Sequence, residues 1–267
     1  MTSGGFAEFE RRGWARRSGT YDGGFGAMTA AAHRPMLAAA GELAGSRVLE
    51  VGCGTGRLAA LAADRGAEVV ATDAVAGMVE EAAAALPGIR VLEAALPGLP
   101  FPDGEFDAAL GAFVINHVPD PPAAAADLHR VLRPGGRTVL TCWDALARNR
   151  AQGVFFDAVA ETGAARPDGV PDTSPFARYA GAEGLAGLLR AAGFTEVRVE
   201  RLEWTHRVDP DRWWHAVLGG TVLTSSLIEG QPPQTVRRIR AAYDRLAAGY
   251  PEGLPVAALL AVGTRPA

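Results

Sequence analysis

The chain has 267 residues, of which 48% are hydrophobic and 21% are charged. This composition is typical of a globular protein with a sizeable core and excludes collagen-like and disordered chains. The net charge is −4, from 26 basic and 30 acidic residues, so no overall positive field attracts nucleic acid or an anionic membrane surface.

The N-terminal segment and the cysteines indicate a cytoplasmic protein. Residues 1–17 carry four arginines and lack the apolar stretch of a secretory signal, and no apolar run reaches the length of a membrane-spanning helix. The two cysteines, Cys53 and Cys142, lie far apart in apolar surroundings. Neither a disulfide framework nor a cysteine zinc site is therefore expected.

Residues 47–144 alternate short apolar runs with alanine-rich stretches, which is typical of successive β-α-β units and of a parallel sheet buried on both faces. The residues after Asp144 predict four further helices, two further strands and a Pro/Gly-rich loop over 166–175 that suits a mobile cover. Strands are expected over Arg47–Val51, Glu68–Thr72, Ile89–Leu92, Phe106–Phe113, Arg137–Cys142, Phe194–Arg207 and Pro255–Val262. Helices are expected over Arg57–Asp64, Val75–Leu86, Pro122–Leu132 (ended by Pro134–Gly136), Ala147–Glu161, Gly181–Ala192, Pro210–Leu218 and Pro233–Ala248.

The most informative segment is VLEVGCGTG at residues 48–56, where a buried strand runs into three alternate glycines, Gly52, Gly54 and Gly56, and then a helix. Glycines let the backbone turn sharply and let a ligand approach the helix N-terminus. This pattern predicts a nucleotide-like cofactor. Arg57 occupies the last position of Gly-x-Gly-x-x-Gly, which disfavours a dinucleotide, and a phosphate-binding P-loop requires a lysine that this sequence lacks.

Two acidic residues narrow the choice of cofactor. Asp73 ends the second strand, where a carboxylate can accept hydrogen bonds from both ribose hydroxyls, although it can also cap the following helix. Glu50 precedes the glycine loop, where it would repel a pyrophosphate and attract an ammonium group such as that of a methionyl moiety. The alternative for Glu50 is an exposed strand end bonded to an arginine.

The segment from Arg47 to Trp143 resembles the class I S-adenosylmethionine-dependent methyltransferases of the small-molecule type. The resemblance rests on VLEVGCGTG, VVATDAVAGM, LPFPDGEFDAAL, INHV and HRVLRPGGRTVLTCW in this order. It implies an α/β fold, Rossmann-like and doubly wound, with a mostly parallel seven-stranded sheet and helical cover insertions. It also implies S-adenosyl-L-methionine as cofactor and S-adenosyl-L-homocysteine as product.

The resemblance assigns roles by position. Gly52, Cys53 and Gly54 line the methionyl part, Asp73 holds the ribose, and Met78 flanks the adenine. Ala95 stands where the family often has an acidic residue, and Leu96 can offer its backbone N–H to the adenine ring. The expected cofactor-binding set is Tyr21, Glu50, Gly52, Cys53, Gly54, Gly56, Asp73, Ala74, Met78, Ala95, Leu96, Phe113 and His117.

His117, which follows the fourth strand at the sheet edge where such folds bind ligands, is the first choice for a general base. The alternative is a histidine that only shapes the methionyl pocket. His206 and His215 are the next choices, and His129 is expected to be solvated. Tyr21 can bond the methionyl carboxylate or simply pack.

Three tryptophans, Trp204, Trp213 and Trp214, form either core or an aromatic wall for a flat substrate. Asp120-Pro121-Pro122-Ala123 lacks the aromatic residue of the motif that methylates the exocyclic amines of bases. Asp144 lacks the neighbouring ligands of a magnesium site, so no metal is expected.

The expected organisation has three parts. Residues 1–46 form a helical cover and cofactor lid, residues 47–144 the cofactor-binding core, and residues 145–267 an acceptor-binding cover with the last two strands. Residues 1–30, 145–180 and 205–250 are expected to close over the acceptor. The predicted function is in-line methyl transfer to oxygen, nitrogen or carbon of a small molecule, expected to be a specialised metabolite. Two alternatives are a cyclase or isomerase on the same fold and, less favoured, an NAD(P)-dependent reductase; the sequence also allows a homodimer.

Overall fold

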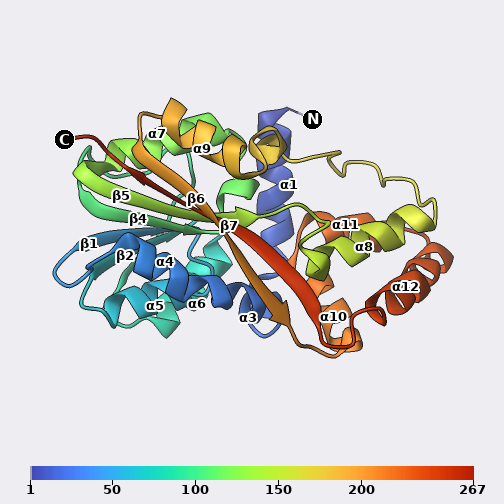
Figure 1. The fold of residues 1–267 in the computed structure, drawn as a ribbon. Coiled ribbons are helices and arrows are strands. Elements are labelled where there is room, and N and C mark those ends of the chain that lie inside the picture. Colours follow the sequence, from blue (N-terminus) through green and yellow to red (C-terminus); the bar gives the residue numbers. More distant parts are fainter. Residues whose placement is uncertain (1) are drawn as a thin grey trace.

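The computed structural model describes residues 2–267; Met1, which opens the predicted N-terminal cover, lies outside the described residues. A single seven-stranded sheet in the order β3-β2-β1-β4-β5-β7-β6 runs through the molecule (Figure 1). Strands β1 to β5 are parallel, whereas β7 pairs antiparallel with both β5 and β6. The predicted mostly parallel α/β fold is therefore confirmed. The strands are β1 (Arg47–Val51), β2 (Glu68–Asp73), β3 (Arg90–Glu93), β4 (Phe106–Ala112), β5 (Leu132–Trp143), β6 (Thr195–His206) and β7 (Leu254–Thr264).

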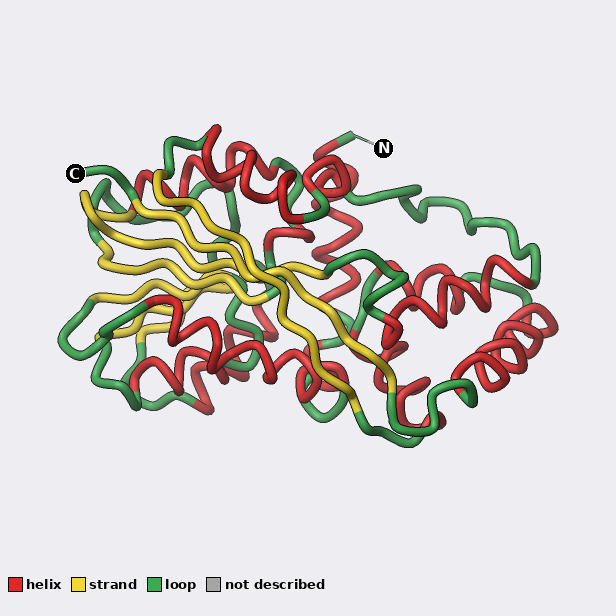
Figure 2. Tube along the Cα trace, viewed as in Figure 1, coloured by secondary structure: helices red, strands yellow, loops and turns green. Residues whose placement is uncertain are grey.

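Helices cover both faces of the sheet, as a doubly wound fold requires (Figure 2). One apolar core joins the sheet to α7 and α9, and a second joins the other face to α4, α5 and α6. The α-helices are α1 (Ser3–Ala15), α2 (Ser18–Tyr21), α3 (Phe25–Thr29), α4 (His33–Ala40), α5 (Arg57–Ala63), α6 (Ala76–Ala85), α7 (Pro121–Val131), α8 (Arg150–Glu161), α9 (Ala182–Ala191), α10 (Pro210–Gly220), α11 (Leu223–Glu229) and α12 (Pro233–Ala247). Short 3₁₀ helices are η1 (Ala30–Ala32), η2 (Ile115–His117) and η3 (Pro175–Tyr179).

Helices α8, α10, α11 and α12 form a lobe beside the sheet (Figure 1). Its core contains Trp213 and Trp214, which are almost fully buried, together with Phe155 and Tyr243. The indole N–H of Trp213 donates a hydrogen bond to the Ala151 carbonyl at 2.8 Å, which satisfies its polar atom inside the lobe. Trp213 and Trp214 are therefore core, which was the first of the two expected roles, whereas Trp204 on β6 is half-buried and packs against the edge of this core.

The structure departs from the predicted elements at two places. Strand β5 begins at Leu132, because Leu132 pairs with Phe106 before a register shift restores regular pairing at Arg137. The Pro134–Gly136 segment is thus a bulged part of the strand rather than only the end of α7. Helix α11 was not predicted, since its seven residues, LTSSLIE, are too few for a clear helical period. Among residues 2–267, no helix has the length and apolar character needed to cross a bilayer.

Candidate active site

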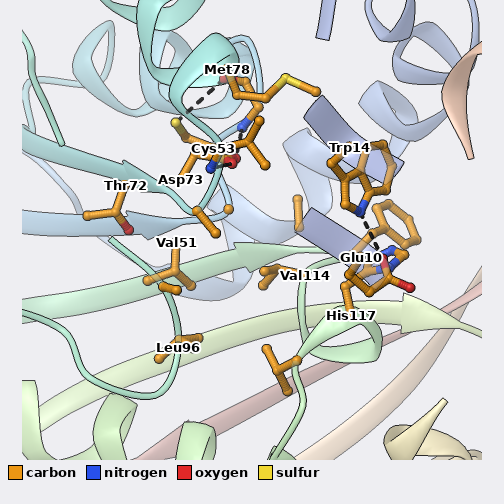
Figure 3. A pocket seen from close by; sticks show the side chains of 18 of the residues that line it. Glu10, Trp14, Val51, Cys53, Thr72, Asp73, Met78, Leu96, Val114 and His117 are labelled. Carbon is orange, nitrogen blue, oxygen red and sulfur yellow. Dashed lines mark hydrogen bonds and ion pairs between the residues drawn. The ribbon is translucent and has the colours of Figure 1, made fainter. Parts of the chain in front are cut away.

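A cavity of about 390 Å³ lies at the carboxyl ends of the central strands, where open α/β sheets bind ligands. The glycine loop after β1, the end of β2, residues 94–96 and the end of β4 form its floor and sides, and helices α1 to α4 supply the rest of the wall. Figure 3 shows this arrangement, with side chains from α1 facing those of the sheet edge. All predicted cofactor-binding residues except Gly56 line this cavity.

The glycine loop shows why glycine is needed at two different positions. Gly54 has a φ of 54°, and a Cβ there would face the cavity wall, with Tyr21 Cε1 as its nearest neighbour at 3.8 Å. Gly56 has a φ of 83° and does not line the cavity. It faces the core instead, where a Cβ on Gly56 would collide with the Leu86 side chain. The prediction that Gly56 lines the cofactor site is therefore wrong: Gly56 allows α5 to pack closely.

Glu50 is a buried carboxyl group in which one oxygen has no hydrogen-bond partner within residues 2–267. Its exposed fraction is 2%, and that oxygen is Oε2. Burial, reinforced by the negative charge of Asp73, raises the pKa of Glu50 to about 8. The alternative of an exposed strand end bonded to arginine is wrong. A buried carboxylate that lines a cavity in this way fits a cationic group of a ligand.

Asp73 connects the glycine loop to the start of α6. Its Oδ2 accepts a hydrogen bond from the Gly54 N–H at 2.9 Å, and its Oδ1 accepts one from the Val75 N–H at 3.0 Å. Burial raises its pKa despite these two hydrogen bonds. Each carboxylate oxygen retains a second acceptor position, so the turn at Val75 and a ribose contact are compatible.

A short N-terminal segment is tied to the glycine loop. Asp22 accepts hydrogen bonds from the Thr55 hydroxyl at 2.9 Å and from Arg57 Nε and Nη2 at 2.5 and 2.7 Å. Tyr21 lines the cavity, and its hydroxyl lies 3.2 Å from that of Thr29. The resemblance placed Tyr21, Asp22 and Phe25 in a segment folded over the cofactor, but the contact of Asp22 with Arg57 was not expected, because no periodicity marks a contact between residues so far apart in the chain.

His117 lines the cavity and belongs to a hydrogen-bonded cluster with two residues of α1 (Figure 3). Its Nδ1 lies 2.9 Å from Glu10 Oε2, and the Trp14 indole N–H donates to the same oxygen at 3.0 Å. The Trp14 and His117 rings meet edge to face, with their centroids 5.2 Å apart. The sequence predicts a cofactor lid over residues 1–46, but no pattern in it marks Glu10 or Trp14 as site residues.

The cavity also has an aromatic wall. Phe113 follows β4 with a φ of 56°, which is unusual for a bulky residue, and its ring stacks on Trp143 at a centroid distance of 4.0 Å. Trp14, Tyr21 and Phe25 complete the aromatic lining. The cavity lining also includes the remaining residues of the predicted cofactor-binding set, Ala74, Met78, Ala95 and Leu96.

The other histidines do not all lie where they were expected. His206 packs against Trp213, and His215 is exposed, so neither lines the cavity. His129 is half-buried against Phe194, at a ring distance of 5.0 Å, and is therefore not simply solvated. His33, which the sequence analysis did not single out, lines the cavity, and its burial lowers its pKa to about 4.

The cavity wall does not include the C-terminal cover. Within the described chain, no residue after Trp143 lines this cavity, because α8 and α10 to α12 pack with one another and against the outer side of α2 and α3, where Trp213 stacks on Phe25. Residues 145–180 and 205–250, which were expected to close over the acceptor, do not line this cavity. Residues 171–179 instead border a second cavity of about 500 Å³, which shares Pro119 with the first.

Asp144 is a buried structural acid. Its carboxylate accepts hydrogen bonds from Arg148 Nε at 2.7 Å and from Arg201 Nε at 2.6 Å, and the Arg148 contact is the main cause that holds its pKa well below the usual range. No group of three or more potential metal-ligating side chains occurs in the part of the chain that the structure describes.

The strand order and the glycine loop place an acidic cavity at the carboxyl edge of a parallel sheet, where open α/β sheets bind ligands. Residues 49–140 match the family model described as a methyltransferase domain. The match covers less than half of the chain, so it is residues 49–140 that are similar to a methyltransferase domain.

Curated relatives match part of the chain. An uncharacterized protein of Mycobacterium tuberculosis H37Rv is 34% identical over 175 residues, which cover 61% of this chain and 62% of that protein. A demethylmenaquinone methyltransferase of Beutenbergia cavernae is 39% identical over 107 residues, which cover 40% of this chain and 45% of that protein. The chain thus spans less than two thirds of the length of these relatives.

Solved structures share the fold over most of the chain. The YcgJ protein of Bacillus subtilis has a TM-score of 0.57 and 22% identity, with coverage of 88% of this chain and 98% of that one. Phosphoethanolamine N-methyltransferase 2 of Haemonchus contortus, solved with phosphomonomethylethanolamine and S-adenosylhomocysteine, has a TM-score of 0.56 and 15% identity, with coverage of 88% and 52%.

Proposed function

We propose that this protein transfers the methyl group of S-adenosylmethionine to a small, planar and largely apolar acceptor. The observation that carries the proposal is that Glu50, His117 and an aromatic wall share one cavity above the glycine loop. Glu50 offers a charge for the cofactor, His117 offers a base, and the aromatic rings offer flat surfaces for an acceptor.

In the proposed complex, the cofactor lies along the carboxyl edge of the sheet. The Glu50 carboxylate binds the ammonium of the methionyl group, which Gly52, Cys53 and Gly54 contact. Asp73 accepts hydrogen bonds from the ribose. The remaining proposed contacts are made by Tyr21 to the methionyl carboxylate and by Ala74, Met78, Ala95, Leu96 and Phe113 around the nucleoside and the methyl group.

The bound cofactor supplies an activated methyl group on a sulfonium. The tasks left to the protein are to exclude water, to hold the acceptor atom in line with the methyl group, and to take up the acceptor's proton. The aromatic wall of Trp14, Phe113 and Trp143 serves the first two tasks. His117 serves the third, as a base suited to neutral pH.

The acceptor class follows from the lining of the cavity. An aromatic hydroxyl, or a ring carbon made nucleophilic by one, would stack on the wall and present its proton to His117. The name of the Beutenbergia cavernae relative, a demethylmenaquinone methyltransferase, agrees with a ring acceptor. We further propose a cytoplasmic enzyme of specialised metabolism that acts on neither nucleic acid nor a membrane surface.

The domain roles follow the same proposal. Residues 1–46 act as the cofactor lid and residues 47–144 as the cofactor-binding core. For residues 145–267, the border of the second cavity at residues 171–179 supports a role in admitting the acceptor rather than in lining the transfer site.

Two measurements test the proposal. Calorimetry should detect S-adenosylhomocysteine binding and no comparable binding of NADPH; tight binding of NADPH alone would overturn it. Mass spectrometry after incubation with S-adenosylmethionine and a panel of phenols and naphthoquinols should find a product heavier by one methyl group. An isomer of unchanged mass would instead indicate the cyclase alternative. His117→Ala should lower turnover far more than S-adenosylhomocysteine affinity.

A further inference from the structure

We infer that Glu10 is a positioning residue, which holds the neutral His117 ring with its proton on Nδ1 and leaves Nε2 as the proton acceptor. The inference rests on the proposed function, because it concerns the same transfer step. It adds a residue of α1 to a site for which the sequence names only Tyr21 from the predicted N-terminal lid.

The hydrogen-bond chemistry of the cluster determines the tautomer. An ionised carboxylate can only accept hydrogen bonds, so the 2.9 Å contact between His117 Nδ1 and Glu10 Oε2 requires a proton on Nδ1. In a neutral imidazole the other nitrogen is then an acceptor. No hydrogen bond within residues 2–267 engages His117 Nε2.

The Glu10 carboxylate is itself held in place. Its residue is 8% exposed, and the Trp14 indole N–H donates to Oε2, the same oxygen that faces His117. Trp14 also packs edge to face against both His117 and Tyr21, at ring distances of 5.2 and 5.6 Å. Few rotamers are left to the carboxylate, so the orientation of the imidazole is built in before an acceptor arrives.

The charge of Glu10 has a second consequence. When the methyl group passes from sulfur to the acceptor oxygen, the O–H bond breaks, its electron pair stays on oxygen, and the proton moves to His117 Nε2. The imidazolium that results is positive, and the adjacent Glu10 carboxylate stabilises it electrostatically. The proton then leaves to solvent, and S-adenosylhomocysteine is the uncharged sulfide product.

The cluster also couples the base to the cover of the cavity. Glu10 and Trp14 both lie on α1, which forms part of the cavity wall (Figure 3). His117 is therefore oriented for proton transfer only while α1 lies over the cavity. The position of α1 that covers the cavity against water is therefore also the position in which Glu10 orients the His117 ring.

Nitrogen NMR of the full chain in complex with S-adenosylhomocysteine tests the tautomer without any acceptor. With ¹⁵N-labelled histidine, and with His117 assigned from the His117→Ala spectrum, wild-type His117 at high pH should show a protonated Nδ1 and an unprotonated Nε2. Glu10→Met, which removes the acceptor at similar volume, should lose this signature. Glu10→Gln should keep it, since the amide oxygen can still accept from Nδ1. A wild-type His117 protonated on Nε2 would overturn the inference, as would an unchanged signature in Glu10→Met.

Kinetics with a phenol or naphthoquinol that the methylation screen identifies give the second readout. Glu10→Met should lower kcat by about tenfold or more, with KM for the cofactor and S-adenosylhomocysteine affinity within about threefold of wild type. Glu80→Gln, on the exposed face of α6, is the matched control and should behave as wild type. Equal kcat in Glu10→Met and wild type would overturn the inference. Absence of any methylated product would instead refute the proposed function and leave the NMR result to decide about Glu10.

Discussion

The raised pKa of Glu50 predicts how the affinity for S-adenosylhomocysteine changes with pH. Its pKa of about 8 means that the carboxyl group of the ligand-free protein is mostly protonated at neutral pH. A ligand ammonium needs the ionised form, so binding must release a proton from Glu50 below pH 8. About 1% of the group is ionised at pH 6 and about half at pH 8, so S-adenosylhomocysteine affinity should rise about 50-fold over this range.

Isothermal titration calorimetry at pH 6, 7 and 8 measures this change. Repeating each titration in two buffers with different ionisation heats also counts the protons released, which should approach one at pH 6. Glu50→Gln removes the titrating group, so its affinity should be low and nearly independent of pH. Glu80→Gln, an exposed glutamate on α6, should keep the wild-type dependence. A wild-type affinity that is flat between pH 6 and 8, or a Glu50→Gln variant that keeps the slope, would refute the reasoning.

The same pKa shift predicts how stability changes with pH. The pKa of Glu50 is raised in the folded state, so the folded protein binds more protons than the unfolded chain between pH 4.5 and about 8. The free energy of unfolding should therefore fall as pH rises through this window, by on the order of 5 kcal/mol for this group. Thermal unfolding of the ligand-free protein at pH 5 and pH 8 should show the loss in wild type and a smaller loss in Glu50→Gln. An equal loss in both would mean that Glu50 is not the group responsible.

Three further substitutions test other parts of the site. Gly54→Ala should weaken S-adenosylhomocysteine binding by about tenfold in calorimetry. An alanine at this position must adopt a positive φ, at a cost of about 1–2 kcal/mol, and its Cβ projects toward Tyr21. Unchanged affinity would show that the cofactor does not approach this loop. Asp22→Asn should speed S-adenosylhomocysteine release about two- to fivefold in stopped-flow measurements, because its ion pair with Arg57 is partly exposed and contributes less than about 1 kcal/mol; a slower release would contradict a clamping role. Trp213→Ala should lower the free energy of unfolding by about 3–5 kcal/mol in urea while leaving S-adenosylhomocysteine affinity unchanged, since Trp213 is fully buried core; the opposite pattern would place it in the site.

The part of the site that could be predicted from sequence is the part built from local signals. The glycine loop and Asp73 lie within or directly after strands whose apolar runs are easy to recognise, and the carboxyl ends of parallel strands meet at one edge. Their shared location follows from topology alone. Gly56 shows the limit of this argument, since a glycine in the same loop serves packing against Leu86 and not the ligand.

The part that could not be predicted depends on contacts between distant segments. Glu10 lies 107 positions before His117, and Asp22 lies 35 positions before Arg57. A glutamate in a helix with neighbouring arginines has the pattern of a solvated surface, and only the position of α1 over the cavity buries it. The same reason explains why the helices of residues 145–267 do not line the cavity. Each amphipathic helix must bury its apolar face, but its sequence pattern does not indicate which part of the protein that face packs against.

Glu10 and Glu50 are two of the carboxylates that line the cavity, and their different surroundings separate their roles. Glu10 has two partners, a histidine and an indole N–H, so its charge is already committed to groups of the protein. Glu50 is equally buried but has an oxygen with no partner anywhere in the described chain. A buried carboxylate with an unpartnered oxygen, such as Glu50, lowers the stability of the fold unless a cation binds it. A buried carboxylate whose hydrogen bonds are made, such as Glu10, costs little stability and orients its neighbour. The difference in hydrogen bonding, more than the residue type, assigns Glu50 to the ligand and Glu10 to the base.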